Sequence, residues 1–116
     1  MPSLIALRSP IRPAAEWLFN LGKSWDRTLR VTSVRRSWAE QDQLYNRFKR
    51  GLTTLPVAPP GHSLHQYGLA FDMARPGIDP FNDSLLPQLG AIWNSIGGGW
   101  HASDPVHFEV RPGPGR

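Results

Sequence analysis

Apolar residues recur at helical spacing in three stretches of the chain, and each stretch predicts an amphipathic helix. The first begins after Pro13, a residue that suits the first helical position, and we expect it to end at Gly22. Its apolar face is made by Ala14, Trp17, Leu18 and Leu21. The last stretch ends at the glycines 97–99, and its apolar face is made by Leu85, Leu86, Leu89, Ile92, Trp93 and Ile96. From these faces we expect core positions for Trp17, Leu18, Trp93 and Ile96.

The middle stretch carries the clearest helix boundaries. Ser37 and Glu40 have the S-x-x-E spacing of a capping box, in which each side chain satisfies the other residue's backbone amide. Gly51 suits the position just past the helix end, where a left-handed backbone is common. The apolar face between these boundaries is made by Leu44, Tyr45 and Phe48. A Pro-rich segment over residues 52–61 then predicts a loop.

Three shorter segments predict strands. Residues 29–33 alternate between apolar and polar or β-branched side chains, residues 69–74 form a short apolar run, and a last strand spans about 106–110. Strands of this length between the three helices predict an α+β fold with a small, mostly antiparallel sheet and about three helices.

Composition narrows the class of protein. The 116 residues predict one domain, 1–116, with a frayed tail over about 111–116. There is no cysteine, so any metal must be held by His, Asp or Glu. Lys and Arg number 13 against 9 for Asp and Glu, which gives a formal charge of +4 and favours an anionic partner such as nucleic acid, a membrane surface or an acidic cell wall.

The sequence offers no sign of membrane insertion or export. No apolar run approaches the ~18 residues that a membrane-spanning helix needs, so we expect no membrane insertion. We also expect synthesis in the cytoplasm without an obvious signal peptide, because charged residues and prolines interrupt the start of the chain, at Arg8, Pro10, Arg12 and Pro13. A nucleic-acid partner is not expected, since the cations form no run along the sequence.

All four histidines lie in two short segments, each of which also carries an aspartate. His62 and His65 precede Asp72, while His101 and His107 flank Asp104; we expect His62 and His101 to lie outside the ligand set. His65 lies in the loop that leads into the strand over 69–74, and Asp72 is expected at the far end of that strand. If this strand pairs with the last one, His65, Asp72 and His107 converge as two imidazoles and one carboxylate, a donor set that suits zinc. Asp104 would then lie close enough to act as a general base.

At these residues the sequence resembles the zinc D-alanyl-D-alanine peptidases, a family that includes phage L-alanyl-D-glutamate endopeptidases. The family pattern S-x-H-x-x-G-x-A-x-D is matched by Ser63, His65, Gly68, Ala70 and Asp72. A second pattern, GG-x-W followed by D-x-x-H-F-E, is matched by a Gly pair within 97–99 and by Trp100, Asp104, His107, Phe108 and Glu109. A third block is matched by Ser33, Arg36, Ser37, Glu40, Gln41, Leu44 and Tyr45, although Val34 and Arg35 replace the family's usual Gly-aromatic pair.

The resemblance implies a role for each matched residue. It implies that Zn²⁺ is bound by His65, Asp72 and His107, with Asp104 as the general base and Arg36 as the cation that faces the substrate carbonyl. It also implies the α+β fold shared with the Hedgehog signalling domain. We expect two further residues to bind substrate, Ser63 and Trp100, although a turn cap and a half-buried core aromatic are the alternatives for them. Because Arg36 precedes the predicted capping box, we expect its replacement to leave folding unaffected.

The resemblance predicts an endolysin-like zinc metallopeptidase that cuts a bond in the stem or cross-link peptides of bacterial peptidoglycan. We therefore expect a peptidoglycan peptide as the partner, a monomeric protein, and action on the bacterial cell wall. Two alternatives stay open: a D-alanyl-D-alanine carboxypeptidase or dipeptidase of the same family, and a non-catalytic zinc-binding module of the same fold. The presence of both Asp104 and Arg36 argues against the last, because a binding module needs neither.

Overall fold

The computed structural model describes residues 3–111, so most of the predicted tail lies outside the described residues. The described chain contains three α-helices, three strands and three short 3₁₀ helices. In chain order they are η1 Leu4–Ala6, α1 Arg12–Trp25, β1 Arg30–Ser33, α2 Trp38–Lys49, η2 Leu64–Tyr67, β2 Ala70–Ala74, η3 Pro80–Asn82, α3 Leu85–Ser95 and β3 His107–Glu109. The predicted α+β fold is confirmed. No helix in this part of the chain is both long and apolar enough to cross a membrane.

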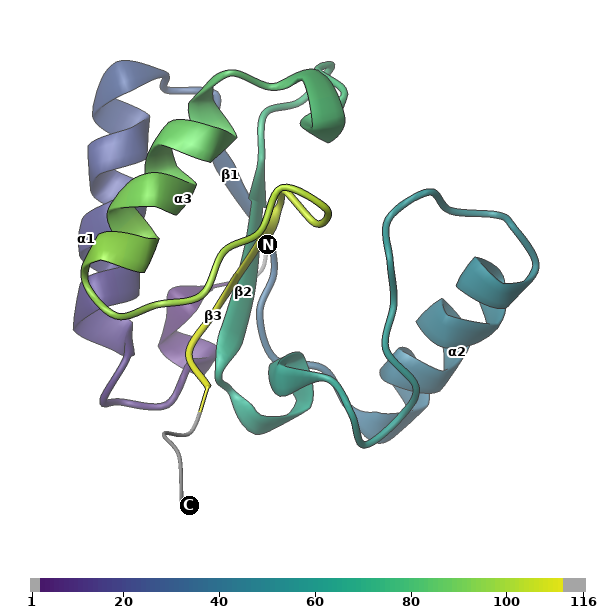
Figure 1. Cartoon of the computed structure of the whole chain (residues 1–116). Helices are drawn as coiled ribbons and strands as arrows, with labels where there is room; N and C mark the ends of the chain where they lie inside the picture. Colours follow the sequence, from purple (N-terminus) through teal and green to yellow (C-terminus); the bar gives the residue numbers. More distant parts are fainter. Residues whose placement is uncertain (1–2, 112–116) are drawn as a thin grey trace.

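The sheet separates a helical layer from a more open side. Its strand order is β1-β2-β3, and the central strand β2 pairs antiparallel with both neighbours. Figure 1 shows α1 and α3 side by side against one face of this sheet, whereas α2 and the loop that follows it stand on the other side. The face of the sheet covered by α1 and α3 therefore forms the core, and the face toward α2 leaves room for a site.

Strand alternation decides which side chains enter the core. Phe71 and Met73 of β2 are fully buried with Phe108 of β3, and the Phe71 and Phe108 rings stack with their centroids 5.4 Å apart. Because successive side chains of a strand point to opposite faces, Asp72 and His107 face away from this core. Asp72 is thus the third residue of the five-residue β2, in the middle of the strand and not at its far end as predicted.

Helix α2 begins and ends where the sequence predicts. Ser37 Oγ accepts from the Glu40 amide and Glu40 Oε1 accepts from the Ser37 amide, which completes the capping box. Gly51 has a φ of 73°, in the left-handed region that favours glycine. The helix has one buried residue, and that residue is polar: Gln41.

Two predictions about the core are wrong, and so is one about a helix end. Trp17 and Ile96 are each 51% exposed. Trp17 lies on the flank of α1, whose buried residues are Ala15, Leu18 and Gly22, and Ile96 follows the end of α3. Gly22 was predicted to end α1 but lies inside it, and a Cβ there would come 2.5 Å from Leu29 Cδ2. The glycine permits close packing, and the helix continues past it to Trp25.

Candidate metal centre

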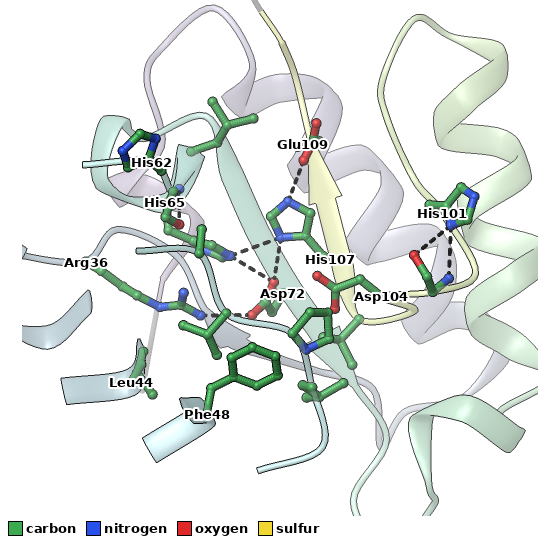
Figure 2. A pocket seen from close by; sticks show the side chains of 18 of the residues that line it. Arg36, Leu44, Phe48, His62, His65, Asp72, His101, Asp104, His107 and Glu109 are labelled. Atoms are coloured by element: carbon green, nitrogen blue, oxygen red, sulfur yellow. Dashed lines mark hydrogen bonds and ion pairs between the residues drawn. The ribbon is translucent and has the colours of Figure 1, made fainter. Parts of the chain in front are cut away.

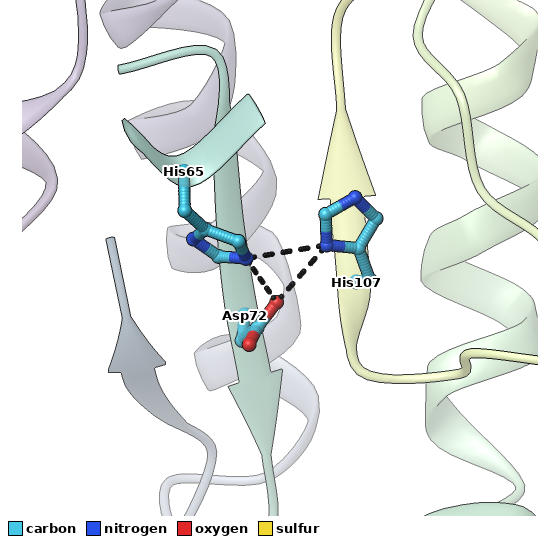
Figure 3. A group of neighbouring side chains, drawn as sticks. All are labelled: His65, Asp72 and His107. Carbon is cyan, nitrogen blue, oxygen red and sulfur yellow. Dashed lines mark hydrogen bonds and ion pairs between the residues drawn. The ribbon is translucent and has the colours of Figure 1, made fainter. Parts of the chain in front are cut away.

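His65, Asp72 and His107 converge from three separate elements. His65 comes from η2, Asp72 from the middle of β2 and His107 from the first position of β3, where it is the direct cross-strand partner of Asp72. His65 Nε2 lies 3.0 Å from Asp72 Oδ1 and 3.2 Å from His107 Nδ1, and His107 Nδ1 lies 3.3 Å from Asp72 Oδ1 (Figure 3). One donor atom of each residue therefore faces a common point.

Each imidazole is held by its other nitrogen. His65 Nδ1 lies 2.6 Å from the Val34 carbonyl oxygen, which can only accept, so Nδ1 carries the proton. His107 Nε2 lies 2.7 Å from Glu109 Oε1, and a carboxylate likewise accepts. When both rings are neutral, His65 Nε2 and His107 Nδ1 are therefore unprotonated, and their lone pairs point toward Asp72. Such outer partners are the usual means of orienting metal-binding histidines.

The donor set fits zinc. A tetrahedral zinc ion with bonds of about 2.0–2.1 Å separates neighbouring ligand atoms by about 3.3 Å, close to the three distances above. Without a cation or an added proton, two nitrogen lone pairs and a carboxylate oxygen would repel one another at this spacing. His65, Asp72 and His107 also form the only group of potential metal ligands found among residues 3–111. These three residues would hold the ion and leave a fourth position open.

The close spacing of the three side chains also shifts the pKa values of Asp72 and His107. Burial disfavours a charged His107, but the carboxylates of Asp72 and Glu109 outweigh that effect and raise the pKa of His107 to about 9. Burial likewise opposes ionisation of Asp72, yet hydrogen bonds to His107 and His65 hold the pKa of this carboxyl well below its usual range. The site therefore favours a carboxylate beside positive charge, as a metal ion would also provide.

Arg36 reaches the same carboxylate from the opposite side. Its Nη2 donates to Asp72 Oδ2 at 3.1 Å, its Nε to Ser33 Oγ at 3.0 Å and its Nη1 to Gln41 Oε1 at 3.1 Å. The Gln41 amide in turn donates to the Ala58 carbonyl at 2.8 Å. Arg36 is therefore built into the fold by three hydrogen bonds, which the sequence did not predict. The burial of Gln41 gave no sequence signal either, because a glutamine on a helix is ordinarily exposed.

Asp104 lies at the edge of this group. Figure 2 shows it beside His107, on the same side of the sheet as Asp72. Burial is the main cause that raises the pKa of Asp104, with the negative charge of Asp72 adding to it, although His107 opposes the shift. A general base needs a carboxyl group of this kind near the reacting water, but the role of Asp104 as that base stays a prediction.

A cleft of about 820 Å³ contains the metal ligands, Asp104 and Arg36. Leu44 and Phe48 of α2 line one side, and His101 lies on the other (Figure 2). His62 and His101 are exposed and stand apart from the three ligands, as expected.

The two residues expected to bind substrate, Ser63 and Trp100, both line the cleft. Each also has a structural partner. Ser63 Oγ accepts from the His65 amide at 3.3 Å and so caps η2. Trp100 Nε1 donates to the Pro105 carbonyl at 2.8 Å. Substrate binding by Ser63 and Trp100 stays a prediction.

Comparisons with solved structures find proteins of similar fold. Vancomycin resistance D,D-dipeptidase VanXYg, in complex with a D-Ala-D-Ala phosphinate analogue, matches with a TM-score of 0.68 and 23% identity, over 93% of this chain and 51% of that one. A variant of the D,D-pentapeptidase VanY from a VanB-type resistance cassette, in complex with Zn(II), matches with a TM-score of 0.66 and 21% identity, over 90% and 72% of the two chains. The LD-carboxypeptidase LdcB matches with a TM-score of 0.64 and 20% identity, over 90% and 58%.

At these identities the structural likeness shows the fold, and this chain spans about half the length of VanXYg. A search of curated protein sequences gives no significant match. A family model does match: VanY, D-alanyl-D-alanine carboxypeptidase, over residues 4–89. The matched range includes Arg36, His65 and Asp72, and it covers well over half of the 116 residues. The chain therefore belongs to the VanY D-alanyl-D-alanine carboxypeptidase family.

Proposed function

We propose that this chain is a zinc-dependent peptidase that acts on the peptides of bacterial peptidoglycan in the cell wall. The observation that carries the proposal is the convergence of His65 Nε2, Asp72 Oδ1 and His107 Nδ1, each imidazole being oriented by a separate acceptor. Family membership supports the substrate class. The formal charge of +4 suits an anionic wall polymer. All three ligands come from one chain, so a monomer is expected to suffice.

Zinc in this position would polarise the scissile carbonyl and lower the pKa of the attacking water. Asp104 then accepts a proton from that water and passes it to the leaving amine. The pKa of Asp104 is shifted upward, toward neutral pH, and a residue that acts first as a base and then as an acid works best with a pKa near the working pH.

Arg36 stabilises the negative charge that develops on the carbonyl oxygen. A guanidinium has five N–H donors. The three hydrogen bonds to Ser33, Gln41 and Asp72 occupy three of them, so two donors remain for substrate. Because those three bonds fix the guanidinium beforehand, it does not need to reorganise during the reaction.

Two bond specificities, that of a carboxypeptidase and that of an endopeptidase, are each favoured by one observation. The family match favours removal of a C-terminal D-amino acid. The cleft volume of about 820 Å³ favours a longer peptide, because it is near the upper end of the roughly 300–1,000 Å³ of small-molecule sites. A longer peptide is compatible with the endolysin-like endopeptidase that the sequence predicts.

Digestion of purified peptidoglycan with the zinc-loaded protein, followed by mass analysis of the products, tests the proposal. A carboxypeptidase releases free D-alanine, whereas an endopeptidase releases fragments with new amino termini. Asp104→Ala serves as the matched inactive control. Absence of any product, or hydrolysis that is equally fast in the control, would contradict the proposed function and favour a non-catalytic zinc-binding module.

A further inference from the structure

The proposed base is carried by a loop. Asp104 lies between the isolated bridge at Gly99 and the start of β3 at His107, outside any helix or strand. Among residues 3–111, no side chain or amide donates a hydrogen bond to its carboxylate. The position of that carboxylate therefore depends on the backbone of the loop over 100–106.

That backbone is closed by one indole. Trp100 Nε1 donates to the Pro105 carbonyl at 2.8 Å, so a side chain at the start of the loop holds the residue just after Asp104. Two backbone bonds complete the turn: Asp104 N donates to the His101 carbonyl and His107 N to the Asp104 carbonyl, both at 3.0 Å. The loop is thus folded around Asp104 and connected to the ligand His107.

The indole is itself fixed to α3. It packs on the backbone at Gly90, where a Cβ would overlap the ring. The Asn94 side chain then binds both backbone groups of Trp100: Asn94 Oδ1 accepts from the Trp100 amide at 2.8 Å, and Asn94 Nδ2 donates to the Trp100 carbonyl at 3.2 Å. Helix α3 therefore holds Trp100 in place, and Trp100 in turn holds the Pro105 carbonyl of the loop.

We infer that Trp100 is a positioning residue for the proposed reaction: its indole N–H sets the place of Asp104 by holding the Pro105 carbonyl. The inference rests on the proposed function, because it concerns the geometry of the base. It differs from the predicted role in substrate binding. Loss of a substrate contact raises KM, whereas displacement of a base lowers kcat and leaves KM nearly unchanged.

The test is Trp100→Phe, which keeps an aromatic ring on Gly90 and removes the N–H donor. We expect full zinc content, nearly unchanged KM and a fall in kcat of roughly 10- to 100-fold, since a misplacement of about 1 Å can cost that much. Hydrogen exchange at the amides of Asp104 and His107 should accelerate. Asn94→Ala, at an exposed position outside the cleft, should cause a smaller change of the same kind. Trp17→Phe, on the exposed flank of α1, is the matched control and should change nothing.

Each outcome either supports or overturns the positioning role of Trp100. A rise in KM at unchanged kcat overturns the inference in favour of substrate binding. Unchanged exchange at Asp104 and His107 overturns it whether or not the protein is an enzyme. Faster exchange with unchanged kcat in an active protein shows a purely structural bond and also overturns it. If wild-type protein binds zinc without hydrolysing peptidoglycan, the proposed function fails and the catalytic part of the inference fails with it, while the exchange measurement still decides whether Trp100 fixes the loop.

Discussion

Asp72 and His107 are direct partners across the antiparallel strands β2 and β3, and their donor atoms lie 3.3 Å apart. The sheet thus holds two of the three proposed ligands in a fixed register, and only His65 is contributed by an irregular segment. The neighbouring pair of the same two strands, Phe71 and Phe108, is buried in the core, so the register that joins Asp72 to His107 is also the one that packs the core.

The first prediction concerns zinc. His65→Ala and His107→Ala should each lose stoichiometric zinc by elemental analysis, whereas His101→Ala, at an exposed histidine, should retain it. Because a ligand that binds only the folded state stabilises it, zinc at a hundred times its Kd should add about 2.7 kcal/mol to the free energy of unfolding. A chelator should therefore lower the Tm of wild type but not of His65→Ala. Full zinc retention by both ligand variants would refute the assignment.

The second prediction separates metal binding from chemistry. Asp104→Asn should keep zinc and the fold but lose hydrolysis by about 10²–10⁴-fold, because the base is removed while all three ligands stay in place. Zinc content and peptidoglycan hydrolysis, measured on the same preparation, check this. A parallel loss of zinc would show that Asp104 is itself a ligand.

The third prediction concerns Arg36. Arg36→Ala should lower kcat by about 10²-fold, as for loss of one oxyanion donor. Contrary to the expectation from the sequence, it should also cost about 1–3 kcal/mol of stability, because Ser33, Gln41 and Asp72 lose a partner. Arg35→Ala, at the exposed neighbouring position, is the control for both measurements. Similar kinetics of the two variants would mean that Arg36 does not act on the transition state.

The fourth prediction tests how α2 is attached to the domain. Gln41→Met should cost about 1–3 kcal/mol, since Ala58 O loses a donor and Arg36 an acceptor in a buried place. Hydrogen exchange in the loop over 52–61 should rise at the same time. Gln43→Met, the same change at an exposed position of the same helix, should be near neutral in urea unfolding. Equal stabilities of the two variants would show that Gln41 does not anchor this loop.

The fifth prediction is an acid-sensitive ion cluster away from the cleft. Arg75 binds Asp83 through two nitrogens and Asp26 through a third, which joins the end of α1, the end of β2 and the start of α3. Hydrogen bonds from Thr28, followed by Arg75, lower the pKa of Asp26 to about 2. Burial opposes the same shift in Asp83, but Arg75 and the amides of α3 outweigh it and lower the pKa.

The ordinary pKa of both carboxyls is 3.8, so below about pH 5 the unfolded chain, whose carboxyls are unshifted, binds more protons than the folded one. The stability that this cluster contributes is present above that pH and is lost as the pH falls through the folded pKa values. Urea unfolding between pH 7 and pH 2 should show the decline. Asp83→Asn should flatten it, and Asp42→Asn, at an exposed position of α2, should not.

Local patterns predicted most of the elements, because their signals lie within a few residues. The Ser37–Glu40 capping box and Gly51 are examples, and both are confirmed. The convergence of His65, Asp72 and His107 was also predictable, since antiparallel pairing of the strands on which Asp72 and His107 lie brings these two together.

Other features depend on packing between distant segments and leave no such signal. Trp17 was predicted in the core, but it lies on the flank of α1, whose inner face is made by Ala15, Leu18 and Gly22. The polar contacts of Gln41 with Ala58, and of Trp100 with Pro105, form only once the loops have folded back.

The alternation of side chains along β2 makes the core and the proposed metal site depend on the same strand register. Phe71 and Met73 belong to the core while Asp72, between them, belongs to the cleft. A one-residue slip of this strand would bury the carboxylate and expose both apolar neighbours. Evolution therefore cannot shift the ligand by a single insertion or deletion in β2 without dismantling the core, so sequence change around the centre is confined to substitutions and to the loops on either side.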